Sequence, residues 1–262
     1  MIKGLKPHSH VERAAIIDTL IPLWKQKFGQ NLQAIAACAS YARNQDQSFS
    51  DLELIVFLKT ELAEDQDKYL QRIVDGMLIE ALYVTEEKFL KEHAQLSDQW
   101  YLAGSEVLLP VFNEPFLKQT IAKFKKITHS RTRFVQEAAR QFPDVQEAFA
   151  KVLNALEQKN NESLGLLLFD AVHSLLKTLS LINEKPFTTL SKVISEGRLF
   201  KIKPARFDDL LDFLVKGTYQ NTDALKSSLL TVYESMERIF ETADFPLYDE
   251  SIDPNRPNKS YD

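Results

Sequence analysis

The chain has 262 residues, and 32 Lys and Arg against 37 Asp and Glu give a formal net charge of −5 with neutral histidines. Hydrophobic residues make up 44% and charged residues 26%, which excludes a disordered or fibrous chain. The single cysteine, Cys38, excludes an internal disulfide and a thiolate-rich metal site. The acidic balance disfavours nucleic acid as a partner, and neither a membrane span nor a secretory signal is recognisable. We therefore expect a cytoplasmic protein that binds neither nucleic acid nor membranes.

The first 115 residues mix strand and helix patterns. Apolar, β-prone runs predict strands at residues 32–39, 52–58, 77–84 and 107–112. The run at 107–112 contains Pro110, which favours an edge strand. Helical patterns are expected at residues 11–28, 61–74 and 86–93. Pro22 should kink or split the first of these helices.

Beyond residue 115 the apolar positions recur at helical spacing. The expected helices lie at residues 116–127, 131–142, 145–158, 163–182, 188–194, 207–215 and 222–243. We therefore predict an α+β fold, in which a mixed-sheet domain at residues 1–126 is followed by an all-α helical bundle at 127–248. Residues 249–262 lack a core pattern and are expected to form a mobile tail.

The chemically informative segment follows the first predicted strand. Ser40 and Arg43 come directly after it, and a polar loop leads to a strand that opens with Asp51 and Glu53. The i, i+2 spacing puts both carboxylates on one face of the pleat. Because Glu53 lies in an apolar run, its burial requires a compensating cation, and hard oxygen ligands favour Mg²⁺.

A third carboxylate, Glu80, lies on the next predicted strand and joins the first two if the strands are neighbours. Three carboxylates beside a loop that offers a hydroxyl, backbone N–H groups and an arginine suit nucleotidyl transfer from a nucleoside triphosphate (NTP). The predicted metal ligands and catalytic residues are Asp51, Glu53 and Glu80, and the predicted nucleotide-binding residues are Ser40 and Arg43.

These residues resemble the signature of the nucleotidyltransferase superfamily of DNA polymerase β. Its Gly-Ser pair, spacer and Asp-hydrophobic-Asp/Glu are similar to Ser-Tyr-Ala-Arg at 40–43 and Ser-Asp-Leu-Glu at 50–53. Residues 79–87 and 109–112 resemble the antibiotic branch, the kanamycin and lincosamide nucleotidyltransferases. The resemblance implies Mg²⁺-dependent transfer of a nucleoside monophosphate from an NTP, with ATP expected, to a hydroxyl of an aminoglycoside or lincosamide. It also implies a helical domain, from the same chain or from the second subunit of a homodimer, that completes the acceptor pocket.

Two positions depart from the superfamily pattern. Ala39 stands where glycine usually precedes the serine, and Asn44 stands where glycine often follows the arginine. Asparagine tolerates the left-handed conformation, so Asn44 is a mild change. The methyl group of Ala39 lies where the backbone must approach phosphate, which predicts weaker nucleotide binding or a shifted loop.

The sequence leaves open which residue is the base that accepts the proton of the acceptor hydroxyl. By resemblance to the lincosamide branch it would be Glu92, twelve residues after Glu80. By resemblance to the kanamycin branch it would lie near Asp170 and His173, which share one face of an otherwise apolar helix. Two rival functions also remain: a catalytically weakened nucleotide-binding protein, and a protein-modifying, antitoxin-like partner.

Overall fold

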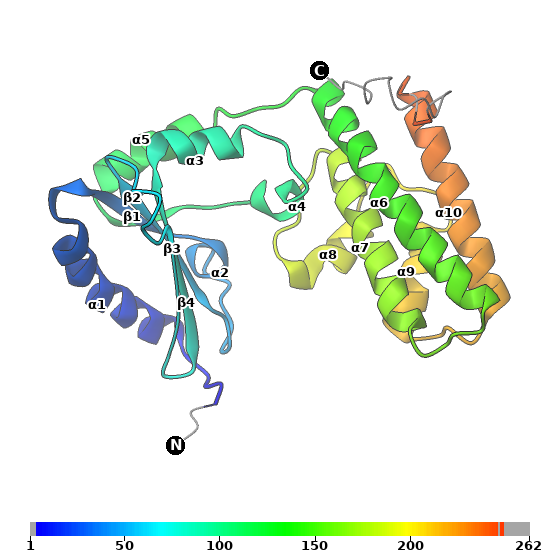
Figure 1. Ribbon diagram of the computed structural model, residues 1–262, viewed down its shortest axis with the longest axis horizontal. Coiled ribbons are helices and arrows are strands. Elements are labelled where there is room, and N and C mark those ends of the chain that lie inside the picture. The colour runs from blue at the N-terminus through cyan, green and yellow to red at the C-terminus, as the bar shows by residue number, and fades with distance from the viewer. Residues whose placement is uncertain (1–3, 246, 249–262) are drawn as a thin grey trace. The chain divides into compact units, whose positions relative to one another are not determined.

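The computed structural model describes residues 4–245, 247 and 248, so the tail expected at residues 249–262 lies outside the described residues. Within them the chain forms two compact units (Figure 1). The first unit runs up to Gln95 and resumes from Glu106 to Thr128, and the second contains Leu96–Ser105 and the chain from His129 on. The first carries a mixed sheet and the second is helical, which confirms the predicted α+β class. The functional domains expected at residues 1–126 and 127–248 stay a prediction.

The first unit is built on a five-stranded sheet with the order β3-β4-β2-β1-β5. The strands are β1 (Leu32–Ala37), β2 (Leu52–Leu58), β3 (Tyr69–Val74), β4 (Met77–Thr85) and β5 (Leu109–Phe112). β2 and β4 pair in parallel, and the remaining neighbours are antiparallel. β5 lies at one edge of the sheet, which confirms the edge strand expected around Pro110.

Helices cover both faces of this sheet, which explains why its central strands are apolar on both sides. These elements are α1 (His10–Phe28), η1 (Gly29–Asn31), α2 (Ala39–Ala42), α3 (Glu86–His93) and α5 (Glu114–Phe124). Ile17 and Trp24 of α1 pack on one face, while Phe89 of α3 and Leu117 of α5 pack on the other.

The helix expected at residues 61–74 is wrong, because its second half is strand β3. β3 forms an antiparallel hairpin with β4 through Asp75 and Gly76, whose φ angles are 49° and 82°. Asp-Gly is a preferred pair for such two-residue turns, since both positions take positive φ. Most of β3 is exposed, so the strand lacks the apolar run that marks the central strands.

Two prolines, Pro22 and Pro143, lie inside helices that continue past them. α6 (Arg131–Glu157) continues through Pro143, so the two separate helices predicted on either side are wrong. α1 likewise continues through Pro22 and is not split. A proline inside a helix removes one hydrogen bond, whereas Phe142 and Val145 on either side of Pro143 are both buried. Burial of the continuous apolar face thus outweighs the lost hydrogen bond.

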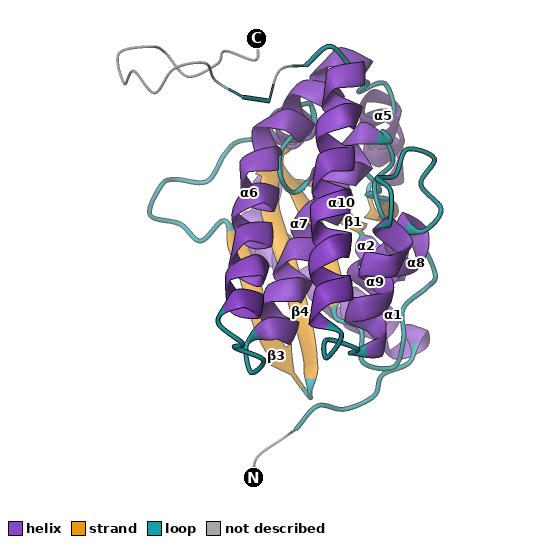
Figure 2. Ribbon diagram, turned by 90° about the vertical axis from the view of Figure 1, so that its right-hand side faces the viewer, coloured by secondary structure: helices purple, strands orange, loops and turns teal. Residues whose placement is uncertain are grey.

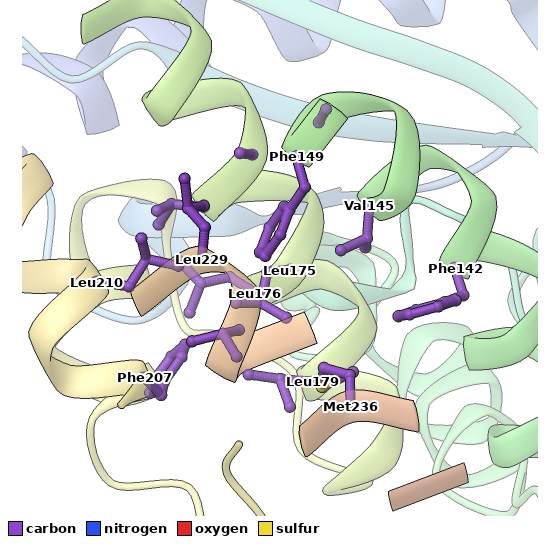
Figure 3. Close-up of a cluster of buried hydrophobic side chains, with 14 of the residues drawn as sticks. Phe142, Val145, Phe149, Leu175, Leu176, Leu179, Phe207, Leu210, Leu229 and Met236 are labelled. Carbon is purple, nitrogen blue, oxygen red and sulfur yellow. The ribbon is translucent and has the colours of Figure 1, made fainter. Parts of the chain in front are cut away.

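The second unit packs its long helices around one core. Its elements are α4 (Trp100–Ala103), α6, α7 (Leu164–Ile182), η2 (Leu190–Lys192), α8 (Val193–Gly197), α9 (Phe207–Lys216) and α10 (Thr222–Thr242). α6, α7 and α10 lie side by side (Figure 2). Figure 3 shows Phe149 of α6, Leu175 of α7, Phe207 of α9 and Met236 of α10 meeting in this core.

Among the described residues, α7 is the one helix whose length and hydropathy would allow it to cross a membrane. More than half of that apolar stretch is buried inside the second unit. Leu168, Leu175 and Leu179 are fully enclosed by the neighbouring helices. The composition of α7 is thus that of a core helix.

Candidate active site

The pairing of β2 with β4 brings three carboxylates together. The two strands run parallel, and Glu53 lies directly opposite Glu80 in their register. Asp51 immediately precedes β2. One carboxylate oxygen from each of these residues lies within 4.8 Å of the other two, and all three side chains are half-buried. The sequence predicts a common role for these residues, and the structure brings them to one location.

Burial and mutual repulsion both act against ionisation of this cluster. Burial, together with the charge of Glu80, raises the pKa of Asp51. Burial, followed by the charges of Asp51 and Glu106, raises the pKa of Glu53 to about 7. A divalent cation would remove both penalties, and three convergent carboxylate oxygens form a hard donor set. The residues present therefore fit a Mg²⁺ ion.

Two residues of the loop beside the carboxylates take left-handed backbone. Ala39 has φ of 51° and Asn44 has φ of 54°, so both positions that replace a glycine take left-handed backbone. Asparagine reaches this conformation at little cost, whereas an alanine there is strained. The N–H of Ala39 donates a hydrogen bond of 3.1 Å to Oε1 of Glu106.

Two groups of this loop remain available to a ligand. In the described part of the chain, Nε of Arg43 is buried and has no hydrogen-bond partner. Because an unpaired buried donor is costly, this atom marks a place for an acceptor such as a phosphate oxygen. Ser40 lies beside it on α2. The structure thus places both predicted nucleotide-binding residues on the short helix and turn that follow β1.

Three neighbours of the carboxylates were not found from the sequence. Glu53 and Glu80 line a cavity of about 180 Å³ together with Tyr69, His93 and Glu106. Burial and the nearby carboxylate of Glu80 raise the pKa of Tyr69. The sequence pattern predicts a helix at strand β3, which carries Tyr69, and the Asp-Gly turn after it is the signal that locates the strand. For Glu106 and His93 no motif in the sequence gives a signal.

A buried arginine supports the loop that delivers Asp51. Arg13 of α1 is 0% exposed, and its guanidinium pairs with Asp46 at 3.0 Å. It also donates to the carbonyl oxygens of His8, Gln47, Ser48 and Ser50. Ser50 receives two of these hydrogen bonds and directly precedes Asp51. Arg13 thereby fixes the peptide from which Asp51 projects, and its charge favours the ionised form of Asp51.

The candidate general bases lie in different places. Glu92 is on α3, where its side chain is 53% exposed and lies 3.8 Å from Lys88. His173 belongs to α7 of the second unit, where Nε2 lies 3.2 Å from the hydroxyl of Tyr101. Burial, with the charge of Lys177, lowers the pKa of His173. The roles of Glu92, Asp170 and His173 stay predictions.

Replacement of Arg13 by methionine should destabilise the first unit strongly. The Arg13→Met variant leaves the buried Asp46 and several loop carbonyls without their donor, at a cost of about 3–5 kcal/mol in the free energy of unfolding. Denaturant unfolding measures this loss. Arg72→Met, at an exposed arginine of β3, is the matched control and should change stability by less than about 0.5 kcal/mol. Equal losses of stability in the two variants would contradict the conclusion that Arg13 holds the loop before Asp51.

The strain at Ala39 predicts that glycine stabilises the loop. Ala39→Gly removes the left-handed penalty and should raise the free energy of unfolding by about 0.5–1 kcal/mol, after the greater flexibility of glycine in the unfolded chain is counted. Ala42→Gly, within the helical turn of α2, should lower it by a similar amount. Destabilisation by both substitutions would argue against strain at residue 39.

The raised pKa of Glu53 predicts a pH-dependent stability in metal-free protein. Its carboxyl contributes most to stability below the ordinary value of 4.5 and loses that contribution as the pH rises through about 7. With a chelator present, Glu53→Gln should therefore be more stable than wild type at pH 8, by about 1 kcal/mol because water screens the partly exposed group. The gain should shrink at pH 5. Glu87→Gln, at an exposed position on α3, is the control, and a pH-independent gain for Glu53→Gln would refute this account.

Comparisons with known proteins identify the family of the chain. A family model described as the KNTase C-terminal domain matches residues 115–245, half of the chain. Two relatives, each named aminoglycoside nucleotidyltransferase (4′), come from Staphylococcus aureus and Bacillus sp. Each is 21% identical over 228 residues, which cover 86% of this chain and 89% of the relative.

A solved structure of a nucleotidyltransferase-like protein from Exiguobacterium sibiricum is also similar, with 11% identity and a TM-score of 0.46. The match covers 87% of this chain and 75% of that one, and is too weak to support an argument. The family model and the two aminoglycoside nucleotidyltransferase relatives confirm the resemblance of the chain to the antibiotic nucleotidyltransferases. The chain belongs to the KNTase C-terminal domain family and is a nucleotidyltransferase.

Proposed function

We propose that this protein transfers a nucleoside monophosphate, with ATP as the expected donor, to a hydroxyl group of an aminoglycoside. The observation that carries the proposal is the convergence of Asp51, Glu53 and Glu80 within 4.8 Å of one another. Two relatives that each match 86% of the chain are named for aminoglycosides. Lincosamides are the alternative acceptors implied by the sequence motifs.

The three carboxylates would hold Mg²⁺, which supplies positive charge to the triphosphate and favours ionisation of the acceptor hydroxyl. Around it, Nε of Arg43 is an unpaired donor that suits a phosphate oxygen, and Ser40 offers a hydroxyl close by in sequence. Arg13 keeps Asp51 in place through the carbonyl of Ser50. Each of these residues thus orients the donor nucleotide before transfer.

The reaction exchanges one bond to the α-phosphorus for another. The acceptor oxygen forms a bond to this phosphorus, and the bond to the oxygen that bridges to the β-phosphate breaks. Pyrophosphate leaves with that electron pair, and the proton of the acceptor hydroxyl passes to a base. The base expected from the sequence is Glu92 or His173.

The charge of the site suits a cationic acceptor. Glu53, Glu80 and Glu106 line one cavity, and the chain as a whole carries a net charge of −5. Aminoglycosides carry several ammonium groups, which such a field attracts. A homodimer and a cytoplasmic location remain expectations from the sequence.

A weakened, nucleotide-binding protein is the second candidate. The strained backbone of Ala39 favours it, because the loop that should approach phosphate takes a conformation costly for alanine. Glu106 also accepts the hydrogen bond of the Ala39 N–H, which a phosphate oxygen would otherwise receive. Both features predict weaker nucleotide binding.

Labelled ATP, Mg²⁺ and a panel of acceptors test the proposal. Wild type should transfer label to aminoglycosides, and Asp51→Asn should slow the transfer at least about 10²-fold, because one carboxylate of the cluster loses its charge. Asp65→Asn, in an exposed loop, is the control with unchanged rate.

Other results would replace the proposal. Retained transfer by Asp51→Asn would remove the carboxylates from the mechanism. Label on polypeptide would support the antitoxin-like alternative, and tight nucleotide binding without turnover would support the weakened protein.

A further inference from the structure

The proposed reaction releases a proton from the acceptor hydroxyl, and the cavity beside the carboxylates contains a group suited to receive it. His93 lines this cavity together with Glu53 and Glu80. It is the last residue of α3 and is half-buried. Imidazole is the side chain that ordinarily exchanges a proton near neutral pH.

The contacts of His93 fix which nitrogen is available. Nδ1 lies 2.8 Å from the carbonyl oxygen of Phe89 in the same helix. A carbonyl oxygen only accepts hydrogen bonds, so Nδ1 carries the hydrogen and the neutral ring keeps its lone pair on Nε2. The ring is held between Phe89, at 4.2 Å between centroids, and Phe124, at 5.1 Å. The imidazole is therefore both oriented and in its basic tautomer.

Other groups of the cavity are engaged elsewhere. Oε1 of Glu80 accepts a hydrogen bond from Nε2 of Gln71 at 2.7 Å. Oε1 of Glu106 accepts from two backbone N–H groups, those of Ala39 and its own neighbour Val107. Glu53 belongs to the carboxylate cluster proposed to hold the metal. Among the described residues that line this cavity, His93 carries the one imidazole, and it lies outside the carboxylate cluster proposed to hold the metal.

Glu92, the residue before His93, lies away from the cavity. Glu92 does not line the cavity, and its carboxylate lies 3.8 Å from the ammonium of Lys88 on the outside of α3. One residue further along the helix, the side chain direction turns by about 100°, which takes His93 to the cavity side. The role expected for Glu92 stays a prediction, and His93 is the residue that the structure places at the cavity.

We propose that His93 is the general base of the nucleotidyl transfer, an inference that rests on the function proposed above. Nε2 accepts the proton of the acceptor hydroxyl as its oxygen bonds to the α-phosphorus, and pyrophosphate leaves with the electron pair of the broken bond. The imidazolium then returns its proton to solvent. Glu106, which lines the same cavity and lies outside the proposed metal cluster, stabilises the positive ring while it is charged.

Steady-state kinetics of His93→Asn with Mg²⁺, ATP and an aminoglycoside test this role. The asparagine amide can still donate to the carbonyl of Phe89 but has no basic nitrogen. We expect kcat to fall at least about 10²-fold, with the KM for ATP within about twofold of wild type. Glu87→Gln, on the exposed side of α3, is the control with unchanged kcat.

Chemical rescue supplies a second readout. Imidazole added to His93→Ala should restore turnover in proportion to its neutral form, by at least about tenfold. His93→Gln replaces His93→Asn if the latter does not fold, as judged by circular dichroism. A kcat of the folded variant within about threefold of wild type, or no response of His93→Ala to imidazole, overturns the proposal.

The remaining outcomes separate this inference from the proposed function. If wild type transfers nucleotide and Glu92→Gln or His173→Gln loses turnover while His93→Asn keeps it, the base is elsewhere and the proposed function stands. If wild type transfers nucleotide to no hydroxyl acceptor, the proposed function and the role of His93 fail together.

Discussion

The parallel pairing of β2 with β4 is the constraint on which the site depends. It sets Glu53 directly opposite Glu80, on one face of a sheet whose central strands are otherwise mostly apolar. A slip of one residue would turn Glu80 to the other face, where α1 packs. The apolar residues that alternate with these carboxylates therefore hold the register, and the energy of core packing keeps like charges together. Part of the free energy of folding offsets the repulsion between these carboxylates, and a bound cation would relieve that repulsion.

Arg13 of α1 holds the loop that precedes β2 and ends at Asp51. Arg13 uses its guanidinium donors on loop carbonyls and Asp46, which turns a segment without regular structure into a fixed platform for Asp51. His10, at the start of the same helix, pairs with Asp46 at 2.8 Å and stacks on Tyr41 of α2. One helix thus anchors both the loop before β2 and the short helix that carries Ser40. Catalytic geometry and stability of the first unit are coupled through these contacts.

The sequence located the central strands and the three carboxylates, because their signals are local: apolar runs, i, i+2 spacing and the Ser-to-Asp interval. It missed β3, whose exposed residues give no apolar run, and so missed Tyr69 beside Glu80. It also divided α6 at Pro143, where burial on both sides keeps one helix. Arg13, Glu106 and His93 reach the site through tertiary packing across long sequence separations, for which a single sequence carries no pattern. The structure brings Asp51, Glu53 and Glu80 together, and their roles, like those of Ser40, Arg43, Glu92 and His173, are still predictions.

The most direct test of the account is a crystal structure with Mn²⁺ and a non-hydrolysable ATP analogue, read by anomalous scattering. The account predicts a metal peak about 2.0–2.2 Å from oxygens of Asp51, Glu53 and Glu80, in contact with the phosphates. An ordered nucleotide whose phosphates lie away from these three carboxylates, with no metal peak among them, would contradict it.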